Sequence, residues 1–193
     1  ADLAPTALVP PDASLELSSH RIIENDFGQA GDTISVRFDD VRVEDLPALF
    51  ARKRGTPLVT TTMTYQDLDE TKPVDRIVNM TDRIDTRGNA LIQRSYTFVT
   101  DSETGTEYLV SRNATTSSQH DGRGNAGREE VISYKVFDTK SSDFDPVTAV
   151  GAITREVDIN YQLMTNRNYD SRGNILSQNI YTYENVGGEL LDV

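Results

Sequence analysis

The sequence contains no cysteine and no tryptophan, and its only histidines are His20 and His120. A chain without cysteine has no disulfide, no thiolate nucleophile and no cysteine-ligated zinc or iron–sulfur site. Two histidines also leave little material for a multi-histidine metal centre. Long hydrophobic runs are missing as well: one of the longest, Leu46–Ala51, spans 6 residues, whereas a membrane-spanning helix needs about 20. We therefore expect no membrane-spanning segment.

Positive charge is scarce. Lys and Arg together number 19 against 31 Asp and Glu, which gives the 193 residues a net charge of −12. A chain this acidic is only weakly attracted to phosphate backbones and to anionic membrane surfaces. We therefore expect no nucleic-acid partner.

Residues that favour strands are abundant by contrast. Val, Ile and Thr together number 48, whereas Ala, Leu and Met together number 29, and this balance favours strands over helices. Alternation is clearest where Val157, Ile159, Tyr161 and Leu163 are predicted to share one face of a strand. The sequence therefore predicts a mainly β protein in which antiparallel hairpins form one extended, twisted or curled sheet.

One short helix is predicted, at residues 44–54. Glu44 and Asp45 stand near its start, Pro47 lies in its first turn, and Gly55 follows its basic end. Acids and Pro at the beginning of a helix, bases near its end and Gly after it are the usual signals for such an element. We expect no other helix.

The composition divides the chain into three regions. Residues 1–13 contain three prolines and show no periodicity, which predicts an extended N-terminal arm or linker. Residues 14–74 are predicted to form a β-rich segment that includes the short helix and a strand at residues 34–38. Residues 75–193 are predicted to form three hairpin repeats that continue the same sheet.

The pentapeptide Asp-x-Arg-Gly-Asn occurs three times, and its glycines are separated by 36 and 49 residues. Gly adopts a positive φ without steric cost, and Asp and Asn are common in tight turns. Each copy lies between two alternating segments, so each predicts a hairpin turn with its Gly at positive φ. The repeated turn residues are Asp85, Arg87, Gly88, Asn89, Asp121, Arg123, Gly124, Asn125, Asp170, Arg172, Gly173 and Asn174.

Aromatic residues follow the turns at regular offsets. In the first and third copies they stand 8 and 10 residues after the glycine, whereas in the second copy the first tyrosine stands 10 residues after it. The second copy is therefore predicted to contain an insertion or bulge of about two residues. We predict a structural role, as cross-strand packing residues, for Tyr96, Phe98, Tyr134, Tyr169, Tyr181 and Tyr183.

The segment Tyr169-Asp170-Ser171-Arg172-Gly173-Asn174-Ile175-Leu176, followed by Tyr181-Thr182-Tyr183, resembles the RHS or YD repeat. The pattern of that family is Tyr-Asp-x-x-Gly-Asn/Arg-Leu followed by Tyr-x-Tyr-Asp. The best match spans residues 169–184, and copies at Ile84-Asp85 and His120-Asp121 extend the resemblance over residues 75–185. The resemblance implies hairpins joined into one long curling sheet, as in the hollow shells of secreted or surface proteins of bacteria.

Several other patterns suggest binding or catalysis. Asp138, Asp143 and Asp145 are candidate calcium ligands on one loop. Apart from calcium, we expect no cofactor. Because the aromatic residues could also form a platform for sugars, the alternative hypothesis is an adhesin-like β domain that binds glycan or calcium. A third hypothesis is a glycoside hydrolase with an acidic site, although 31 acids define no particular carboxylate pair.

Two further motifs are interpreted as structural. The glycines of Gly122-x-Gly124-x-x-Gly127 match a dinucleotide-binding pattern, but that pattern needs a helix after it and a strand is predicted here. His120 beside Asp121 is interpreted as a packing or turn residue rather than as half of an acid–base pair.

The sequence therefore predicts a structural role without catalysis. We expect a segment of a large RHS-like assembly, a shell wall or a filament, at an extracellular or cell-surface location. Its expected partners are other protein subunits or flanking repeats of the same polypeptide, which it would contact through sheet edges and surfaces.

Overall fold

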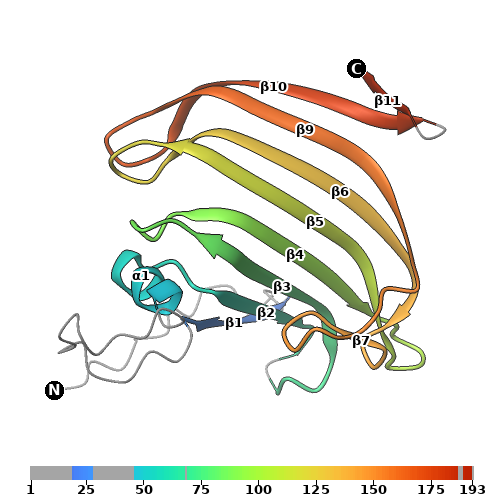
Figure 1. The fold of residues 1–193 in the computed structure, drawn as a ribbon. Coiled ribbons are helices and arrows are strands. Elements are labelled where there is room, and N and C mark those ends of the chain that lie inside the picture. Colours follow the sequence, from blue (N-terminus) through green and yellow to red (C-terminus); the bar gives the residue numbers. More distant parts are fainter. Residues whose placement is uncertain (1–18, 28–45, 68, 187–188, 193) are drawn as a thin grey trace, which may run out of the picture.

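A computed structural model of the chain describes residues 19–27, 46–67, 69–186 and 189–192. One nine-stranded antiparallel sheet dominates it, with the strands in the order β1-β2-β3-β4-β5-β6-β9-β10-β11 (Figure 1). The sheet is open, since β1 and β11 stand at opposite ends of this order. This architecture confirms the predicted fold class. The strands are β1 (His20–Asp26), β2 (Val59–Tyr65), β3 (Pro73–Ile84), β4 (Ala90–Thr100), β5 (Glu107–His120), β6 (Ala126–Lys140), β9 (Arg155–Tyr169), β10 (Ile175–Val186) and β11 (Glu189–Asp192).

The two faces of the sheet differ in chemistry. One face, which we call the aromatic face, carries Val78 opposite Tyr96 and Arg76 opposite Phe98. The other, which we call the polar face, carries uncharged polar side chains that lie opposite one another from strand to strand, interspersed with residues such as Ile77, Val131 and Lys135. One such row is Asn25, Thr60, Asn79, Ser95, Asn113, Ser133 and Asn160.

The hydrophobic core is small and lies on the aromatic face. It consists of Val78, Tyr96, Phe98, Leu109 and Val136, each at most 4% exposed. A second, two-stranded sheet formed by β7 (Phe144–Asp145) and β8 (Val150–Gly151) lies between β6 and β9 in the chain. Its Phe144 ring lies 5.5 Å from the ring of Tyr96, so this excursion covers the core.

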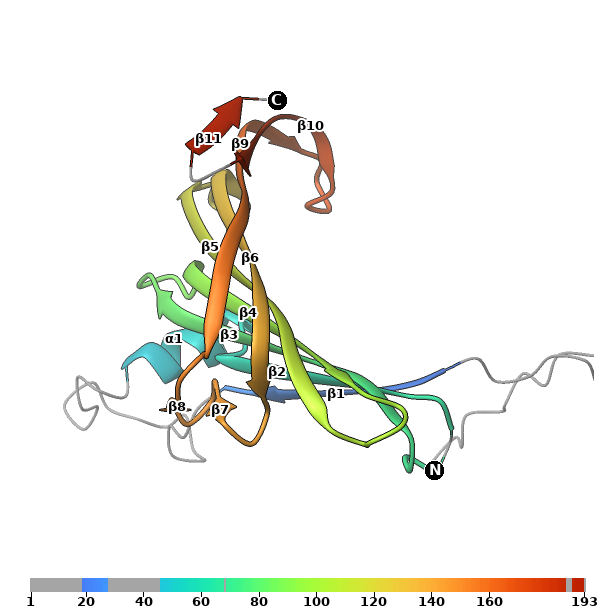
Figure 2. The same cartoon turned by 90° about the vertical axis from the view of Figure 1, so that its right-hand side faces the viewer.

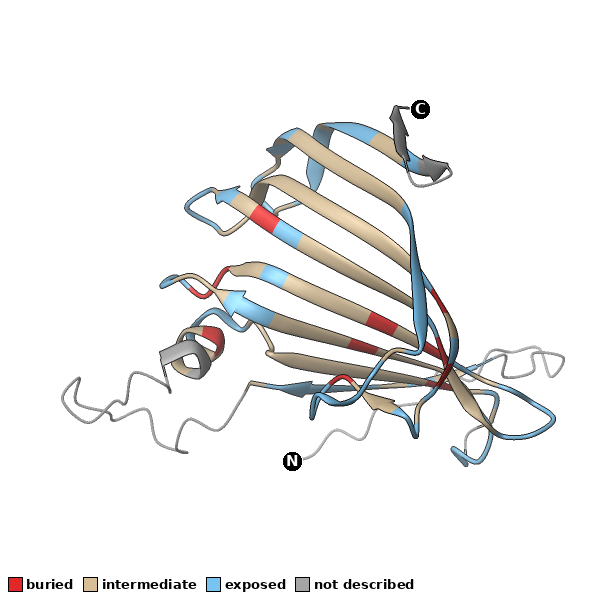
Figure 3. Cartoon of the chain, turned by 45° about the vertical axis from the view of Figure 1, so that its right-hand side comes forward, coloured by how far each residue is buried: buried red, intermediate tan, exposed pale blue. Residues whose placement is uncertain are grey.

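Figure 3 shows the buried residues in two places. One group surrounds the core, and the other lies where helix α1 (Leu46–Arg54) meets the sheet. Buried residues outside the core include Ala51 in α1, Gly88 and Asn89 between β3 and β4, and Ser117 near the end of β5. In contrast, no residue from Arg155 to Glu184 is buried. The described part of the chain therefore covers the third hairpin less completely than the first two.

Helix α1 ends as the sequence predicts. Gly55 has a φ of 79°, its amide donates to the Arg52 carbonyl at 3.2 Å, and the Thr56 amide donates to the Ala51 carbonyl at 2.9 Å. These two bonds form a Schellman motif, which satisfies carbonyls that the end of a helix leaves free. The first two residues of the predicted helix, 44 and 45, lie outside the described residues, as do the predicted arm at 1–13 and the strand at 34–38.

The prediction that Val157 shares one face of β9 with Tyr161 is wrong. Ser133 pairs with Asn160, but the next residue, Tyr134, pairs with Asp158, so a bulge inserts one extra residue in β9. Because a one-residue shift exchanges the faces of a strand, Val157 lies on the opposite face from Tyr161. The bulge predicted from the offset of Tyr134 is not found before that residue, since residues 126–135 of β6 pair with β5 without a shift in register. A bulge is present later in β6, where the three residues 136–138 oppose one residue of β5.

The last strand pair leaves one edge of the sheet open. β11 pairs with Tyr183–Val186 of β10, and no described strand pairs with the outer side of residues 175–182. Figure 2 shows this end of the sheet at the top, away from α1 and from the small sheet of β7 and β8. No helix among the described residues is long and apolar enough to cross a membrane.

Candidate functional site

The three Asp-x-Arg-Gly-Asn copies form hairpin turns with the same hydrogen bonds. The first turn (Asp85–Asn89) joins β3 to β4, the second (Asp121–Asn125) joins β5 to β6, and the third (Asp170–Asn174) joins β9 to β10. In each, the Asp amide donates to the Asn carbonyl at 2.9–3.0 Å, and the Gly amide donates to the Asp carbonyl at 3.0–3.2 Å. This is a type I turn closed by a left-handed glycine, a common three-residue hairpin loop.

Side-chain hydrogen bonds explain why Asp and Asn recur. In all three turns the Asp Oδ1 accepts from the Arg amide at 2.8 Å and from the Asn amide at 2.9 Å. The Asp Oδ2 accepts from the Asn Nδ2 at 2.7–2.9 Å. The repeated arginine thus contributes its backbone amide in every turn, and the Arg123 guanidinium alone also donates to a neighbouring turn, to the Asp170 carbonyl at 3.3 Å.

The same bonds favour the ionised form of the three turn carboxylates. Hydrogen bonds from Asn125 hold the pKa of Asp121 below its usual value, and those from Asn174 do the same for the pKa of Asp170. Partial burial raises the pKa of Asp85, but hydrogen bonds from Asn89 and Arg87 outweigh burial and leave this pKa lowered as well.

The glycines bring neighbouring turns into contact. Gly88, Gly124 and Gly173 have φ values of 81°, 92° and 86°, as predicted. A Cβ on Gly124 would overlap the side chain of Asn89, and a Cβ on Gly173 would lie 3.2 Å from Asn125 Oδ1. The Asn of each turn is therefore seated against the Gly of the next turn. We call this arrangement of the three turns the turn row.

Helix α1 occupies the first position of the turn row. A Cβ on Gly88 would overlap the Phe50 carbonyl oxygen and would lie 2.5 Å from Arg54 Cβ. Thr56, just after the helix, donates from its hydroxyl to the Gly88 carbonyl at 2.9 Å. The helix thus lies against the first turn as the first turn lies against the second. At the other end, no described residue lies against the exposed Asn174 side chain in this manner.

The aromatic face carries a second repeated feature, which sequence reasoning missed. Arg76 lies over the Phe98 ring, 4.1 Å from its centroid, and makes two hydrogen bonds to Glu107 at 2.9 and 2.6 Å. Arg112 lies over the Tyr134 ring at 4.0 Å and makes two hydrogen bonds to Glu156 at 2.9 and 2.7 Å. Each triplet places an arginine, an aromatic ring and a glutamate on three successive strands of the sheet.

The spacing of the sequence contains the signal for these triplets. Both the arginines and the aromatic residues are 36 residues apart, and the glutamates are 49 residues apart. The glycines of the three hairpin turns are separated by the same 36 and 49 residues. In the third repeat the corresponding positions hold Tyr161 and Tyr183, whose rings lie 5.7 Å apart. The third hairpin therefore has an aromatic pair where the others have a charged triplet.

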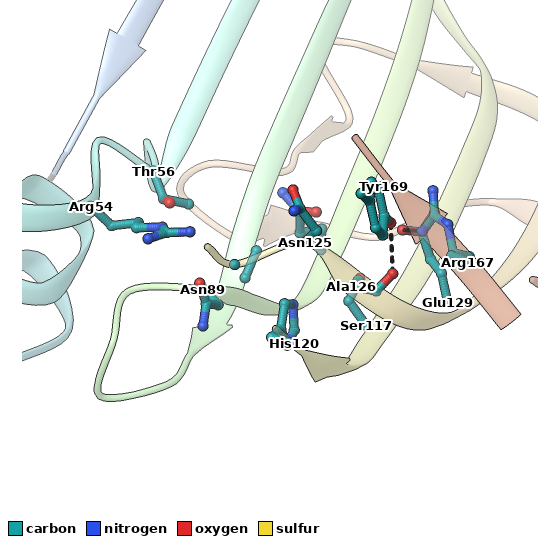
Figure 4. Close-up of a pocket in the computed structure, with 13 residues that line it drawn as sticks. Arg54, Thr56, Asn89, Ser117, His120, Asn125, Ala126, Glu129, Arg167 and Tyr169 are labelled. Carbon is teal, nitrogen blue, oxygen red and sulfur yellow. Dashed lines mark hydrogen bonds and ion pairs between the residues drawn. The ribbon is translucent and has the colours of Figure 1, made fainter. Parts of the chain in front are cut away.

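A cleft of about 300 Å³ opens where α1 meets the turn row (Figure 4). Arg54 and Thr56 line one side, Asn89 and Asn125 come from the first two turns, and Tyr169 lies at the far side. The Tyr169 hydroxyl donates to the Ala126 carbonyl at 2.7 Å, which fixes the ring, and burial raises the pKa of Tyr169. The sequence indicates no such cleft because its sides come from segments far apart in the chain.

The remaining predicted residues are scattered. Tyr96 and Phe98 are in the core, whereas Tyr181 is 44% exposed on β10. Asp145 accepts from the Val147 amide, Asp143 accepts from the Ser142 hydroxyl, and Asp138 lies 3.9 Å from Arg155. The structure does not gather these three calcium candidates, and no three His, Asp or Glu side chains of its described residues form a metal-binding group.

No protein-family model, no curated protein and no solved structure matches this chain. The resemblance to the RHS repeat therefore stays a prediction.

Proposed function

We propose that this chain is a structural section of a larger hairpin-repeat sheet, and that it acts through its edge and its turns rather than by catalysis. The observation that carries the proposal is the turn row, in which one hydrogen-bonded turn recurs three times and each copy is seated against the next. This arrangement of turns can repeat indefinitely, because every turn presents the same surface to the turn beside it.

The two ends of the turn row are not equivalent. Helix α1 lies against Gly88 and takes the position that an earlier turn would occupy. At the other end, residues 175–182 of β10 have no partner on their outer side among the described residues. Leu176 is 70% exposed and Ile180 is 53% exposed on this strand. The sheet is therefore proposed to grow beyond β10, where a further hairpin would pair with this edge and cover apolar surface.

An extracellular or cell-surface location, an RHS-like shell wall or filament, and neighbouring repeats or subunits as partners complete the proposal. Its support is the RHS-like pattern of the third turn together with the open, hairpin-by-hairpin sheet. A second function, glycan recognition, has one observation in its favour, the polar cleft beside the turn row.

Sedimentation velocity of the purified chain over a range of concentrations tests the proposal. An edge strand that is left without its neighbour pairs with another edge, so the isolated chain should associate as its concentration rises. The variant L176K/I180K places two charges on β10 and should be monomeric. The variant V150K places a charge on β8, at a residue that is 66% exposed, and should associate like the unaltered chain. A stable monomer at all concentrations would count against the proposal.

A further inference from the structure

Two side chains of the second turn contact the third turn. Asn125 Oδ1 lies against Gly173, where a Cβ would be 3.2 Å away from it. The Arg123 guanidinium donates to the Asp170 carbonyl at 3.3 Å. The Asn and the Arg of one turn therefore both contact the turn of the following hairpin, whose glycine leaves room for the Asn side chain.

A tyrosine makes a third contact between the same two hairpins. Tyr169, the residue just before the third turn, donates from its hydroxyl at 2.7 Å to the carbonyl of Ala126, the residue just after the second turn. Any residue can supply this backbone acceptor, whereas the donor requires a side chain with a hydroxyl at the position before the Asp. Three contacts therefore define how one turn receives the next.

The third turn has counterparts of the three groups that receive a turn. They are Arg172, Asn174 and the carbonyl of Ile175. Both Arg172 and Asn174 are exposed, and Ile175 is 42% exposed. Within the described part of the chain, the only hydrogen bonds of Arg172 and Asn174 outside the strand ladder are those inside their own turn. In contrast, Asn89, which lies against the second turn, is 4% exposed.

A second copy of this chain does not offer a turn that fits these groups. The glycine of its first turn is covered by α1, and the glycines of its second and third turns are each covered by the Asn of the turn before. Antiparallel pairing of β10 with the β10 of a second copy would place the third turn of that copy at the far end of the strand, away from Asn174. The missing turn must therefore come from a different segment.

The composition of β10 favours pairing with a further strand. Residues 175–183 contain no charged residue and no proline, whereas β1, the edge at the other end of the sheet, contains Arg21, Glu24 and Asp26. Charges and proline on an edge strand disfavour pairing with another chain. A strand antiparallel to β10 would end near Ile175, as β9 ends near Ala126.

We propose that the third turn and β10 bind a further hairpin of the larger sheet, whose turn has a tyrosine before its aspartate and a glycine at positive φ. The tyrosine hydroxyl donates to the Ile175 carbonyl, the glycine lies against Asn174, and the aspartate carbonyl accepts from Arg172. This inference rests on the proposed function, in which the sheet continues past β10, and adds the kind of turn that the segment pairing there must have.

An extended chain with one added hairpin tests this inference. Because the second and third turns are separated by 49 residues, a second copy of residues 137–185 inserted after Asn185 places a fourth turn at the same spacing. The substitution L176M in the added copy gives its fragments a distinct mass. Hydrogen exchange measured by mass spectrometry then reports separately on residues 175–182 of the original β10.

Exchange at residues 175–182 of the original β10 should be at least about tenfold slower in the extended chain than in the 193-residue chain, because an added strand removes the edge. The variant Y169F in the added copy lacks the hydroxyl that donates to Ile175, and exchange there should be about fivefold faster than in the unaltered extended chain. R72 is not involved, and the matched pair is R172Q: in the original third turn it should also speed exchange, whereas in the added copy, which no turn follows, it should change nothing.

The outcomes separate this inference from the proposed function. If the original β10 exchanges equally fast in the extended and 193-residue chains, the sheet does not grow past β10, and both proposals are wrong. If β10 is protected but Y169F in the added copy has no more effect than R172Q in the added copy, the added strand pairs without recognition of its turn. That result would overturn this inference and leave the proposed function standing.

Discussion

Gly88, Gly124 and Gly173 share a positive φ, but their surroundings differ. A Cβ would overlap backbone at Gly88, would overlap two side chains at Gly124, and would be tight against one side-chain atom at Gly173. A left-handed conformation alone costs a residue with a Cβ about 1–2 kcal/mol. We therefore expect Ala substitutions to lower the free energy of unfolding most at Gly88, less at Gly124 and least at Gly173, where the loss is still about 1 kcal/mol. For G173V we expect more than about 1 kcal/mol.

Denaturant unfolding of the three variants measures this order, and Gly122 provides the control. Gly122 lies in the second turn, its φ is not positive, and a Cβ there meets no atom within 4 Å. G122A should change the free energy of unfolding by less than about 0.5 kcal/mol. Equal effects of G122A and G88A would mean that the interpretation of the turns is wrong.

The turn carboxylates make a prediction about acid stability. Asp85, Asp121 and Asp170 have lowered pKa values in the folded chain, whereas an unfolded Asp has a pKa of about 3.9. The unfolded chain therefore binds more protons in acid, so this contribution to stability is present above the unfolded pKa and is lost as the pH falls through the folded values. The free energy of unfolding should decline below about pH 5.

Thermal melts from neutral to acidic pH test this linkage with the variant D121N. An Asn side chain has a single oxygen, so it cannot accept both from the Arg123 and Asn125 amides and from Asn125 Nδ2 as the two Asp121 oxygens do. The melting temperature of D121N at neutral pH should therefore be lower and its decline in acid shallower. D69N makes the same charge change at an exposed residue outside the turns. If D121N and D69N decline in parallel with the unaltered chain, the turn carboxylates are not the source of the acid sensitivity.

At the scale of strands, the charged triplets of the aromatic face connect three strands each. The side chains of Arg112 and Glu156 are 17% and 33% exposed, and the arginine is also stacked on Tyr134. An ion pair that makes two hydrogen bonds and is partly buried has a larger coupling free energy than an exposed ion pair. A double-mutant cycle of R112Q and E156Q should give a coupling free energy of about 1–2 kcal/mol.

The exposed pair of Arg155 and Asp138 is the matched comparison. Its atoms are 3.9 Å apart, and its side chains are 62% and 78% exposed, so its coupling in the same kind of cycle should be below about 0.5 kcal/mol. Similar coupling in the two cycles would show that the triplet adds nothing beyond a surface ion pair.

The hairpin turns could be predicted from the sequence because their hydrogen bonds are made within five consecutive residues. The helix could be predicted for the same reason, since Gly55 acts locally. The face of Val157 could not, because a bulge in β9 depends on how the strand pairs with β6 rather than on its own alternation. The cleft depends on α1 lying against the first turn, and nothing in either segment alone indicates that contact.

At the scale of the whole molecule, burial is concentrated at one end of the sheet. Helix α1 and the small sheet of β7 and β8 cover the first part, whereas no residue from Arg155 to Glu184 is buried. Apolar area removed from water stabilises a fold by about 25 cal/mol per Å², so the third hairpin gains less from its packing than the first two hairpins do. We therefore propose that the neighbour of this chain pairs with β10, beside the third turn.

Electron microscopy of the particle that contains the native polypeptide, together with the mass of that polypeptide, would show whether the sheet continues past β10. We expect a long polypeptide in which the sheet continues past β10 as part of a hollow shell or a regular filament. A discrete particle of 21.5 kDa, with β10 exposed and no further hairpin, would contradict it.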